Sequence, residues 1–211
     1  MSSTRNGSRP PAQTACQTEP VNGSSGVPAG TEELRRRVQQ LSLREQLERH
    51  HFLLERLNAA SARLIEALEH GDVCEAIGEI IANLIGSEEV AIFHYFPLVR
   101  SFKLAWSSGV ENDVLRAFGS GAGFLGRAAH GQTSQFPERL VNTPLMCYEK
   151  NLTACIVLKS SNEVVGVIAI LGLLPQKSCL EWADFELLKF LEVYGAVALQ
   201  FQRLQQEKVA P

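Results

Sequence analysis

Cysteine and histidine are the side chains of this sequence best suited to metal binding, disulfide formation or nucleophilic attack. The five cysteines are Cys16, Cys74, Cys147, Cys155 and Cys179. Their number is odd, none forms a C-x-x-C pair and no secretory signal precedes them, so a disulfide framework is not expected. His50 and His51 are adjacent on a predicted helix, where neighbouring residues point to different faces. We therefore expect free thiols and no metal site.

A glycine-rich segment from Gly119 to Gly131 is the next chemical signal, since such loops can bind phosphates. It lacks the Gly-Lys-Ser/Thr ending of a nucleoside-triphosphate loop. Its spacing Gly121-x-Gly123-x-x-Gly126 fits a dinucleotide pattern, but no parallel strand–helix–strand unit surrounds it and no acidic residue ends a following strand. We interpret the segment as a tight turn into a short helix.

Length and composition place the chain in the globular class. Its 211 residues allow one domain plus an extension, and 45% of them are hydrophobic and 20% charged. A net charge of −3 argues against broad nucleic-acid binding, which needs a basic surface. No apolar run is long enough to span a membrane and no secretory signal is present, so we expect no membrane insertion and a cytoplasmic location.

The sheet that must position any site is centred on a predicted hairpin. Residues 153–159 and 163–174 are rich in β-branched residues, and Ser160–Asn162 predicts a tight turn between them. Because the second strand is apolar on both faces, it should lie in the middle of a sheet that is covered on both sides.

Residues 89–96 and 102–106 predict a second antiparallel hairpin. Simple alternation would place Phe102, Leu104 and Trp106 on one face of it. Residues 132–136 are a candidate short strand, and the long polar loop that follows, residues 137–151, is of a length that is often functional.

Helices should cover this sheet. Residues 72–85 predict a helix with Asp72 as its N-cap, and residues 111–118 a short amphipathic one. The last helix, residues 180–206, should be capped by Ser178. It has two apolar stripes, of which one can bind the sheet while the other meets a partner helix.

The N-terminal third divides into a tail and a long helix. Residues 1–30 contain no Leu, Ile or Phe and predict a flexible tail. Residues 31–69 predict a long helix with a 4,3 alternation that is typical of a coiled-coil seam. The positions of this seam are Leu43, Leu47, His50, Leu54, Leu57, Leu64 and Leu68, with Ser61 between them. The alternative is a single amphipathic helix that lies on its own domain.

Residues 58–204 resemble a GAF domain in the order and spacing of three stretches. These are the glycine-flanked short helix at residues 121–131, the strand at residues 163–170, and the start of the closing helix at residues 184–191. The resemblance implies an α+β fold of GAF/PAS-like type, in which helices flank a central antiparallel sheet of five or six strands. The long coiled-coil helix would precede this domain, which we place at residues 70–206.

The resemblance also implies a ligand-sized pocket beside the sheet. Its candidate lining residues are Phe93, Tyr95, Phe102, Trp106, Phe124, Arg127, Phe136, Met146, Tyr148 and Cys155. For each aromatic residue the competing interpretation is ordinary core packing. Arg127 stands beside the glycine-rich turn, where it could meet an anion, although a solvated helix face would also explain it.

Three functions are compatible with this pattern. The first is a non-catalytic sensor of a small molecule that forms a homodimer through its helices and acts on a partner signalling protein in trans. The second is a dimerisation scaffold with a vestigial pocket. The third is a cysteine-based methionine sulfoxide reductase, an activity found in one branch of the family. Cys147 lies near the position that this activity uses, but Leu125 stands where a second cysteine would be needed, so we expect no enzyme.

Overall fold

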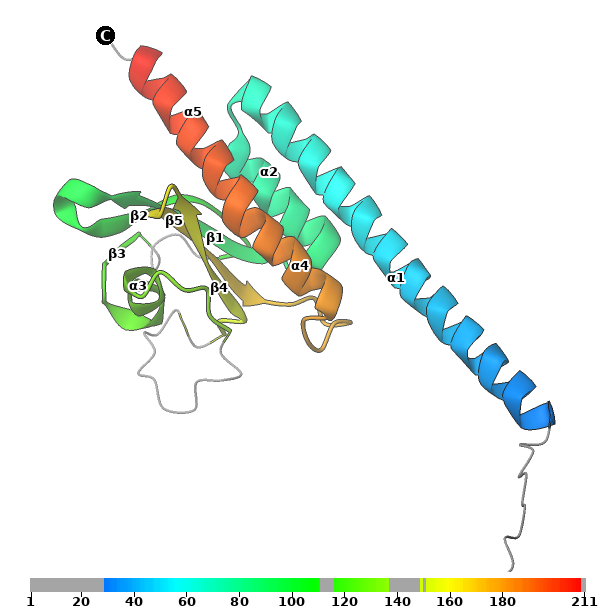
Figure 1. Ribbon diagram of the computed structural model, residues 1–211. Helices are drawn as coiled ribbons and strands as arrows, with labels where there is room; N and C mark the ends of the chain where they lie inside the picture. The colour runs from blue at the N-terminus through cyan, green and yellow to red at the C-terminus, as the bar shows by residue number, and fades with distance from the viewer. Residues whose placement is uncertain (1–28, 111–115, 137–148, 150, 210–211) are drawn as a thin grey trace, which may run out of the picture. The chain divides into compact units, whose positions relative to one another are not determined.

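The computed structural model describes residues 29–110, 116–136, 149 and 151–209 (Figure 1). In chain order the elements are α1 (Ala29–His70), α2 (Val73–Ile80), the π-helical segment η1 (Ile81–Ile85), β1 (Glu89–Phe96), the 3-10 turn η2 (Pro97–Val99), β2 (Ser101–Ser108), β3 (Ala117–Gly119), α3 (Gly123–His130), β4 (Ala154–Ser160), β5 (Glu163–Gly172), α4 (Trp182–Phe190), the π-helical segment η5 (Leu191–Gly195) and α5 (Ala196–Val209). Two units divide the chain, residues 1–45 and 46–211, and their boundary falls within α1.

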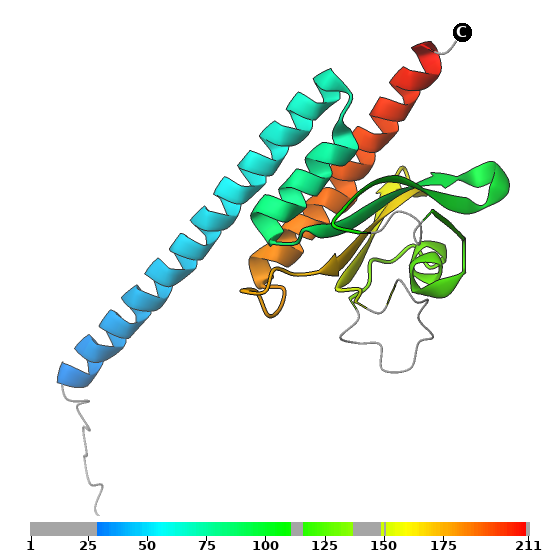
Figure 2. The ribbon, with the colours of Figure 1, turned by 180° about the vertical axis from the view of Figure 1, so that it is seen from behind.

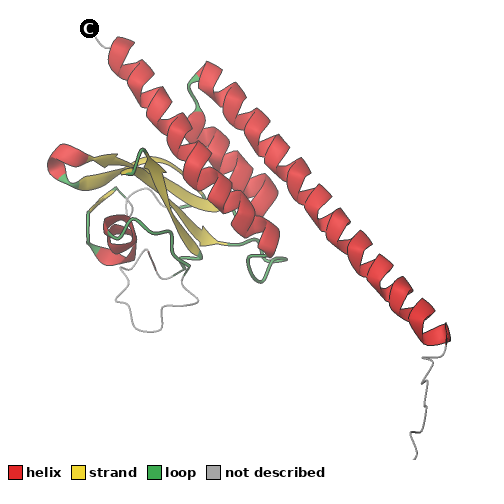
Figure 3. Ribbon diagram, in the orientation of Figure 1, coloured by secondary structure: helices red, strands yellow, loops and turns green. Residues whose placement is uncertain are grey.

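The second unit is built on one antiparallel sheet with the strand order β3-β2-β1-β5-β4. The predicted central hairpin is β4 and β5, and the predicted second hairpin is β1 and β2. Ser161 and Asn162 turn the central hairpin with φ angles of 51° and 67°, as a two-residue turn of the I′ class requires. An α+β fold with a central antiparallel sheet flanked by helices, as predicted, is confirmed (Figure 3).

Alternation along the central strands makes two separate cores, one on each face of the sheet. Ile92, Ile156 and Ile168 are fully or almost fully buried beneath α2, α4 and α5. Phe93 and Val157 belong to the other core, which lies against α3. Figures 1 and 2 show these helices on opposite sides of the sheet. We call the two sides the helical face and the α3 face.

The prediction for Trp106 was wrong because a β-bulge interrupts the alternation in β2. Phe93 pairs with Leu104, whereas the preceding residue of β1, Ile92, pairs with Trp106, so that the register shifts between the two pairs. A bulge inserts one residue and reverses which face the following side chains occupy. Trp106 therefore packs on the helical face, where the absence of a side chain at Gly78 makes room for its ring.

The C-terminal part of α1 packs on the helical face. Leu53, Ala60, Leu64 and Ala67 are at most 9% exposed, and Leu57 and Leu68 pack against the same core. His50 meets Trp182 of α4 at 5.5 Å between ring centroids. Leu57, Leu64 and Leu68 of the predicted seam therefore pack within the chain, as expected if the helix lies on its own domain.

Leu43, Leu47 and Leu54 remain 57–63% exposed, so the predicted seam does not lie on one face. The buried apolar positions of α1 are Leu53, Ala60, Leu64 and Ala67, and this stripe shares only Leu64 with the predicted seam.

Two further boundaries differ from the sequence predictions. Ala117 and Phe118, the end of the predicted short helix, instead form the edge strand β3 together with Gly119, while residues 111–115 lie outside the described part of the chain. The last helix begins at Trp182, and its capping box joins Glu181 with Asp184 in place of Ser178 with Glu181. Within the described residues, no helix combines the length and apolar character needed to cross a bilayer.

Candidate functional site

The glycine-rich segment places the N-terminus of α3 against the sheet. Gly121 and Gly123 adopt φ angles of 88° and 61°, which favour glycine. A β-carbon at Gly126 would lie 2.5 Å from the carbonyl oxygen of Gly119, so only glycine permits this close approach. The N–H of Gly121 donates to the carbonyl of Gly126 at 2.8 Å and closes the turn. The segment is thus a tight turn into a short helix, as predicted.

The carboxylate of Glu149 occupies the start of α3. The N–H of Phe124 donates to Oε1 and Oε2 of Glu149 at 2.8 and 2.9 Å, and the N–H of Leu125 donates to Oε1 at 2.9 Å. These amides belong to the first turn of a helix, where backbone donors have no partner within the helix. Ala122 at the N-cap position has no side-chain oxygen, and Glu149, which is fully buried, fills that role.

Four of the predicted pocket residues meet in the core of the α3 face. Phe93, Phe102, Phe124 and Cys155 are at most 1% exposed, and Tyr95 packs against them. The rings of Phe102 and Tyr95 are 4.7 Å apart between centroids. The predicted grouping of these five is therefore found as one packed apolar cluster.

The other five predicted pocket residues do not join this cluster. Trp106 lies on the helical face, and Phe136 packs edge-on against Phe185 of α4 at 5.0 Å between centroids. Arg127 is exposed on α3. Met146 and Tyr148 lie outside the described residues.

Sequence reasoning missed three members of this side of the sheet. Phe118 stacks on Phe102 with centroids 4.9 Å apart, and it was missed because its strand was assigned to a helix. Leu152 and Glu149 come from the end of the long polar loop. Only the proximity of that loop to the central hairpin could have indicated them, because no motif distinguishes Glu149 from Glu138, the other acid of the loop.

Two of the three described thiols are poorly placed for nucleophilic chemistry, whereas Cys179 is exposed. Burial, together with the nearby charge of Glu149, raises the pKa of the Cys155 thiol. Burial raises the pKa of Cys74 to about 11. Since the thiolate is the nucleophile, both groups are protonated and unreactive near neutral pH. Among the described residues no group of three His, Cys, Asp or Glu side chains could hold a metal ion.

A second buried carboxylate, that of Asp184, joins the helical layer. Its Oδ1 accepts from Arg56 of α1 at 2.8 Å, and its Oδ2 lies 2.6 Å from Nζ of Lys177 and accepts from the N–H of Glu181 at 2.7 Å. Arg56 also donates to the carbonyl of Leu84. Burial acts to raise the pKa of Asp184, but the hydrogen bonds from Lys177, Arg56 and Glu181 outweigh it and hold that pKa below its usual range.

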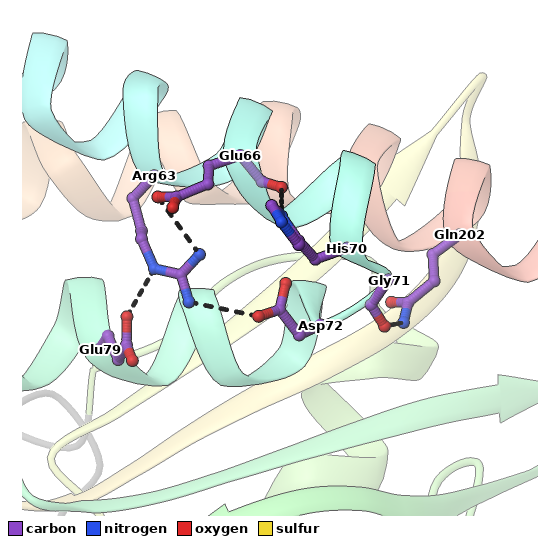
Figure 4. Close-up of polar contacts among 7 residues, drawn as sticks. All are labelled: Arg63, Glu66, His70, Gly71, Asp72, Glu79 and Gln202. Carbon is purple, nitrogen blue, oxygen red and sulfur yellow. Dashed lines mark hydrogen bonds and ion pairs between the residues drawn. The ribbon is translucent and has the colours of Figure 1, made fainter.

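Arg63 ties α1 to α2 nearer to the C-terminal end of α1 (Figure 4). Its guanidinium donates to Glu79 at 2.5 Å and reaches Asp72 at 3.5 Å and Glu66 at 3.8 Å. The hydrogen bond with Glu79 raises the pKa of Arg63. Gln202 of α5 donates to the carbonyl of Gly71, so the α1–α2 turn is held from both sides.

The closing helix presents an apolar stripe that none of the described residues covers. Tyr194, Val197, Phe201 and Leu204 follow a 4,3,4,3 spacing that begins at Phe190, and each of these four is 48–57% exposed. Phe190 stacks on Tyr194 with centroids 4.7 Å apart. The opposite side of the helix, including Leu191, Ala198 and Leu199, is buried against the sheet. The sequence predicts one stripe of Leu187, Leu191, Tyr194, Ala198 and Phe201 and a second of Phe190, Val197 and Leu204. The structure buries Leu187, Leu191 and Ala198, but it leaves Tyr194 and Phe201 exposed beside Val197 and Leu204.

In sequence, no family model and no curated protein matches the chain. In structure it is similar to the GAF domain of a phosphoenolpyruvate-protein phosphotransferase from Coxiella burnetii. The identity is 13%, the TM-score 0.59, and the match covers 74% of this chain and 96% of that one. It is also similar to residues 122–287 of a methyl-accepting chemotaxis protein, at 15% identity and a TM-score of 0.55 over 69% of this chain and 98% of that one.

A third similar structure is that of an enzyme. It is the free methionine-R-sulfoxide reductase of Neisseria meningitidis in complex with its substrate, at 12% identity and a TM-score of 0.52 over 72% of this chain and 89% of that one. Identities of this size establish shared architecture and leave the activity open. The sheet order, the two cores, the short α3 and the closing helix, together with these matches, show that the chain has the GAF fold.

Proposed function

We propose that this chain is a non-catalytic regulatory module that senses a small molecule, forms a homodimer through its helices and acts on a partner protein in trans. The observation that carries the proposal is the uncovered stripe of Tyr194, Val197, Phe201 and Leu204 on a helix whose opposite side is buried. The GAF fold supports a signalling role, since the similar structures include domains of a phosphotransferase and of a chemotaxis protein.

A second copy of this chain is the occupant that best fits the stripe. Apolar side chains at 4,3 spacing are the pattern with which two identical helices pack knobs into holes. A two-fold axis would bring the same residues of both copies together, as in most homodimers. Leu47 and Leu54 of α1 are exposed as well and offer further apolar surface to a partner.

Sedimentation equilibrium tests the dimer. The double variant Tyr194→Asp and Phe201→Asp places a charge in each copy of the interface and should give a folded monomer. The control is Gln206→Asp, because Gln206 is exposed on the same helix but away from the stripe. A monomeric wild type at tens of micromolar, or a double variant with the wild-type mass, would remove the dimer from the proposal.

The absence of catalysis is supported by two of the three described cysteines, the third being the exposed Cys179. Cys155 is fully buried and Cys74 has a pKa of about 11, while Leu125, at the position of a second thiol, is itself buried. Cys147 lies outside the described residues. An assay for reduction of free methionine-R-sulfoxide, run with the wild type and Cys147→Ser, decides the matter. We expect no turnover, and turnover that disappears in the variant would establish an enzyme.

The scaffold with a vestigial pocket is the second candidate. It is favoured by the tight packing of Phe93, Phe102 and Phe124. It is also favoured by the burial of the Glu149 side chain against the start of α3. Native mass spectrometry of the purified protein separates the two candidates, because a sensor would retain or take up a small molecule, whereas a scaffold would not.

A further inference from the structure

A cavity of about 470 Å³ opens on the helical face, between α2, α5 and the hairpin of β1 and β2. A volume of this size is typical of small-molecule sites in proteins. Polar side chains of both helices line the cavity together with the ring of Trp106. The chain therefore offers a candidate ligand site on the side of the sheet opposite to the aromatic cluster of the α3 face.

Asp72, at the start of α2, has a carboxylate oxygen that lacks a partner. Its Oδ2 lies 3.5 Å from Arg63, whereas its Oδ1 is the only buried side-chain nitrogen or oxygen of the described residues without a hydrogen bond. Asp72 lines the cavity, and Figure 4 shows it between Arg63 and the contact of Gln202 with Gly71. A buried oxygen without a donor is costly, so a donor group that enters the cavity beside Asp72 would be stabilising.

The neighbouring side chains favour a donor that carries a positive charge. Glu75 adds a second carboxylate to the cavity wall that the first turn of α2 forms. The half-buried Trp106 adds an aromatic ring, and ammonium groups are attracted to the faces of such rings. His94 is neutral at pH 7 because burial and the neighbouring Arg203 lower its pKa, so the imidazole does not repel a cation.

The guanidinium of Arg203 also lines the cavity, but it is engaged at the wall that β1 forms. Its Nη1 donates to the carbonyl of Tyr95 at 3.1 Å, and its Cζ lies 5.5 Å from the centroid of the Phe96 ring. Asp72 and Glu75 line the wall that α2 forms. The cavity therefore has an acidic wall at which an ammonium group can bind.

We propose that this cavity binds a small organic cation, whose ammonium group lies at Asp72 and Glu75 and whose apolar body packs against Trp106. The proposal deepens the sensing role proposed above and rests on it, since it assigns the sensed ligand to a site. Gln202, which also lines the cavity, belongs to α5 and follows Phe201 of the exposed stripe. A ligand in the cavity thus contacts the helix on which the proposed dimer depends.

Phenethylammonium is the probe, with 2-phenylethanol and phenylacetate as its neutral and anionic counterparts. The readout is the indole N–H signal of Trp106 in nitrogen–proton correlation spectra, which Trp106→Phe assigns because the chain has two tryptophans. We expect phenethylammonium to move this signal in a saturable manner, and the two counterparts to require concentrations about tenfold higher or more. Equal responses to all three probes, or an unmoved signal of Trp106, would overturn the proposal.

Asp72→Asn removes the charge of the acidic wall and keeps the size of the side chain. The matched control is Glu79→Gln, because Glu79 also pairs with Arg63 but does not line the cavity. We expect the Kd for phenethylammonium to rise about tenfold in Asp72→Asn and to stay unchanged in Glu79→Gln. A wild-type Kd in Asp72→Asn would contradict the proposal.

A second variant keeps the proposal testable if Asp72→Asn does not fold. Glu75 is exposed, so Glu75→Gln should leave the fold intact and raise the Kd for phenethylammonium about threefold. An unchanged Kd in Glu75→Gln would then overturn the proposal.

Failure of this site and failure of the sensing role give different results. If native mass spectrometry detects a retained small molecule while phenethylammonium leaves the Trp106 signal unmoved, the sensing role stands and this site is wrong. If phenethylammonium binds as expected but sedimentation equilibrium gives the same mass with and without it, the site stands and sensing through the dimer is wrong.

Discussion

The two faces of the sheet each bury one carboxylate at the start of a helix, and the two are held in different ways. Asp184 belongs to the helix that it caps and is met by Arg56 and Lys177, which come from two other segments. Glu149 caps a helix distant in sequence and is seated on the backbone amides of Phe124 and Leu125. The first arrangement joins several elements by charge, so removing it should damage the whole helical layer. The second concerns one helix end, so its removal should act mainly on α3.

Removing the Asp184 carboxylate should have the largest effect on folding. Asp184→Ala leaves Arg56 and Lys177 with no counter-charge at that position, and breaking a buried pair in this way costs about 3–5 kcal/mol. The measurement is urea unfolding. Glu186→Ala on the same helix is the matched control, since its partner Lys189 is exposed and the cost should be about 0.5 kcal/mol or less. Equal losses in the two variants would contradict the role given to Asp184.

Two leucines of α1 test which part of the helix belongs to the core of the helical face. Leu64 is 4% exposed and Leu54 is 63% exposed. Leu64→Ala should lower the free energy of unfolding by about 2–5 kcal/mol through the cavity that it leaves. Leu54→Ala should stay within about 0.5 kcal/mol for the monomer. Urea unfolding at low protein concentration measures both losses. A larger loss for Leu54→Ala than for Leu64→Ala would mean that Leu54, and not Leu64, belongs to the core.

A glycine on each face measures how tightly that face is packed. Gly126→Ala directs its β-carbon at the backbone oxygen of Gly119, which cannot move aside, and should cost about 1–3 kcal/mol. Gly78→Ala instead meets the ring of Trp106, which lies only partly buried and can shift. The loss should therefore be smaller at Gly78 and be accompanied by a change in Trp106 fluorescence. Similar losses of unfolding free energy in the two variants, with unchanged Trp106 fluorescence, would mean that the ring of Trp106 does not shift.

The smallest effect concerns His94 on β1. Burial and the neighbouring Arg203 lower the pKa of His94, and the Cys74 sulfur lies 3.9 Å from its Nε2. The unfolded chain thus takes up a proton at higher pH than the folded one. Stability should be full above about pH 6.5 and decrease as the pH falls from there towards the lower folded value. Denaturation midpoints of the wild type should fall over this window, and His94→Gln should abolish that part of the slope.

Much of the fold could be predicted because it depends on local patterns. Residues 89–96 and 163–172 form strands since their β-branched and apolar residues suit a doubly covered sheet, and Ser161 and Asn162 tolerate the positive φ of the turn. The glycines before α3 likewise indicated a tight turn, and grouping Phe93, Phe102 and Phe124 needed only alternation and the resemblance.

Two of the failures depend on contacts between distant residues. A single bulge moved Trp106 to the other face, and the folded domain buries Leu64 of α1 while Leu54 stays exposed. Neither change has a signal in composition or spacing, since each arises from how one element settles against another.

The sequence by itself therefore determined the elements, their order and the two-sided sheet, because hydrophobic period and turn chemistry act over a few residues. The tertiary structure decided which apolar stripe remains uncovered and which acid becomes a cap. Glu149 is an example. In the sequence it is one acid of a polar loop, and it becomes a helix cap only because the folded structure brings the backbone amides of Phe124 and Leu125 next to it. The energy that selects it comes from desolvated donors that exist only after the chain has folded.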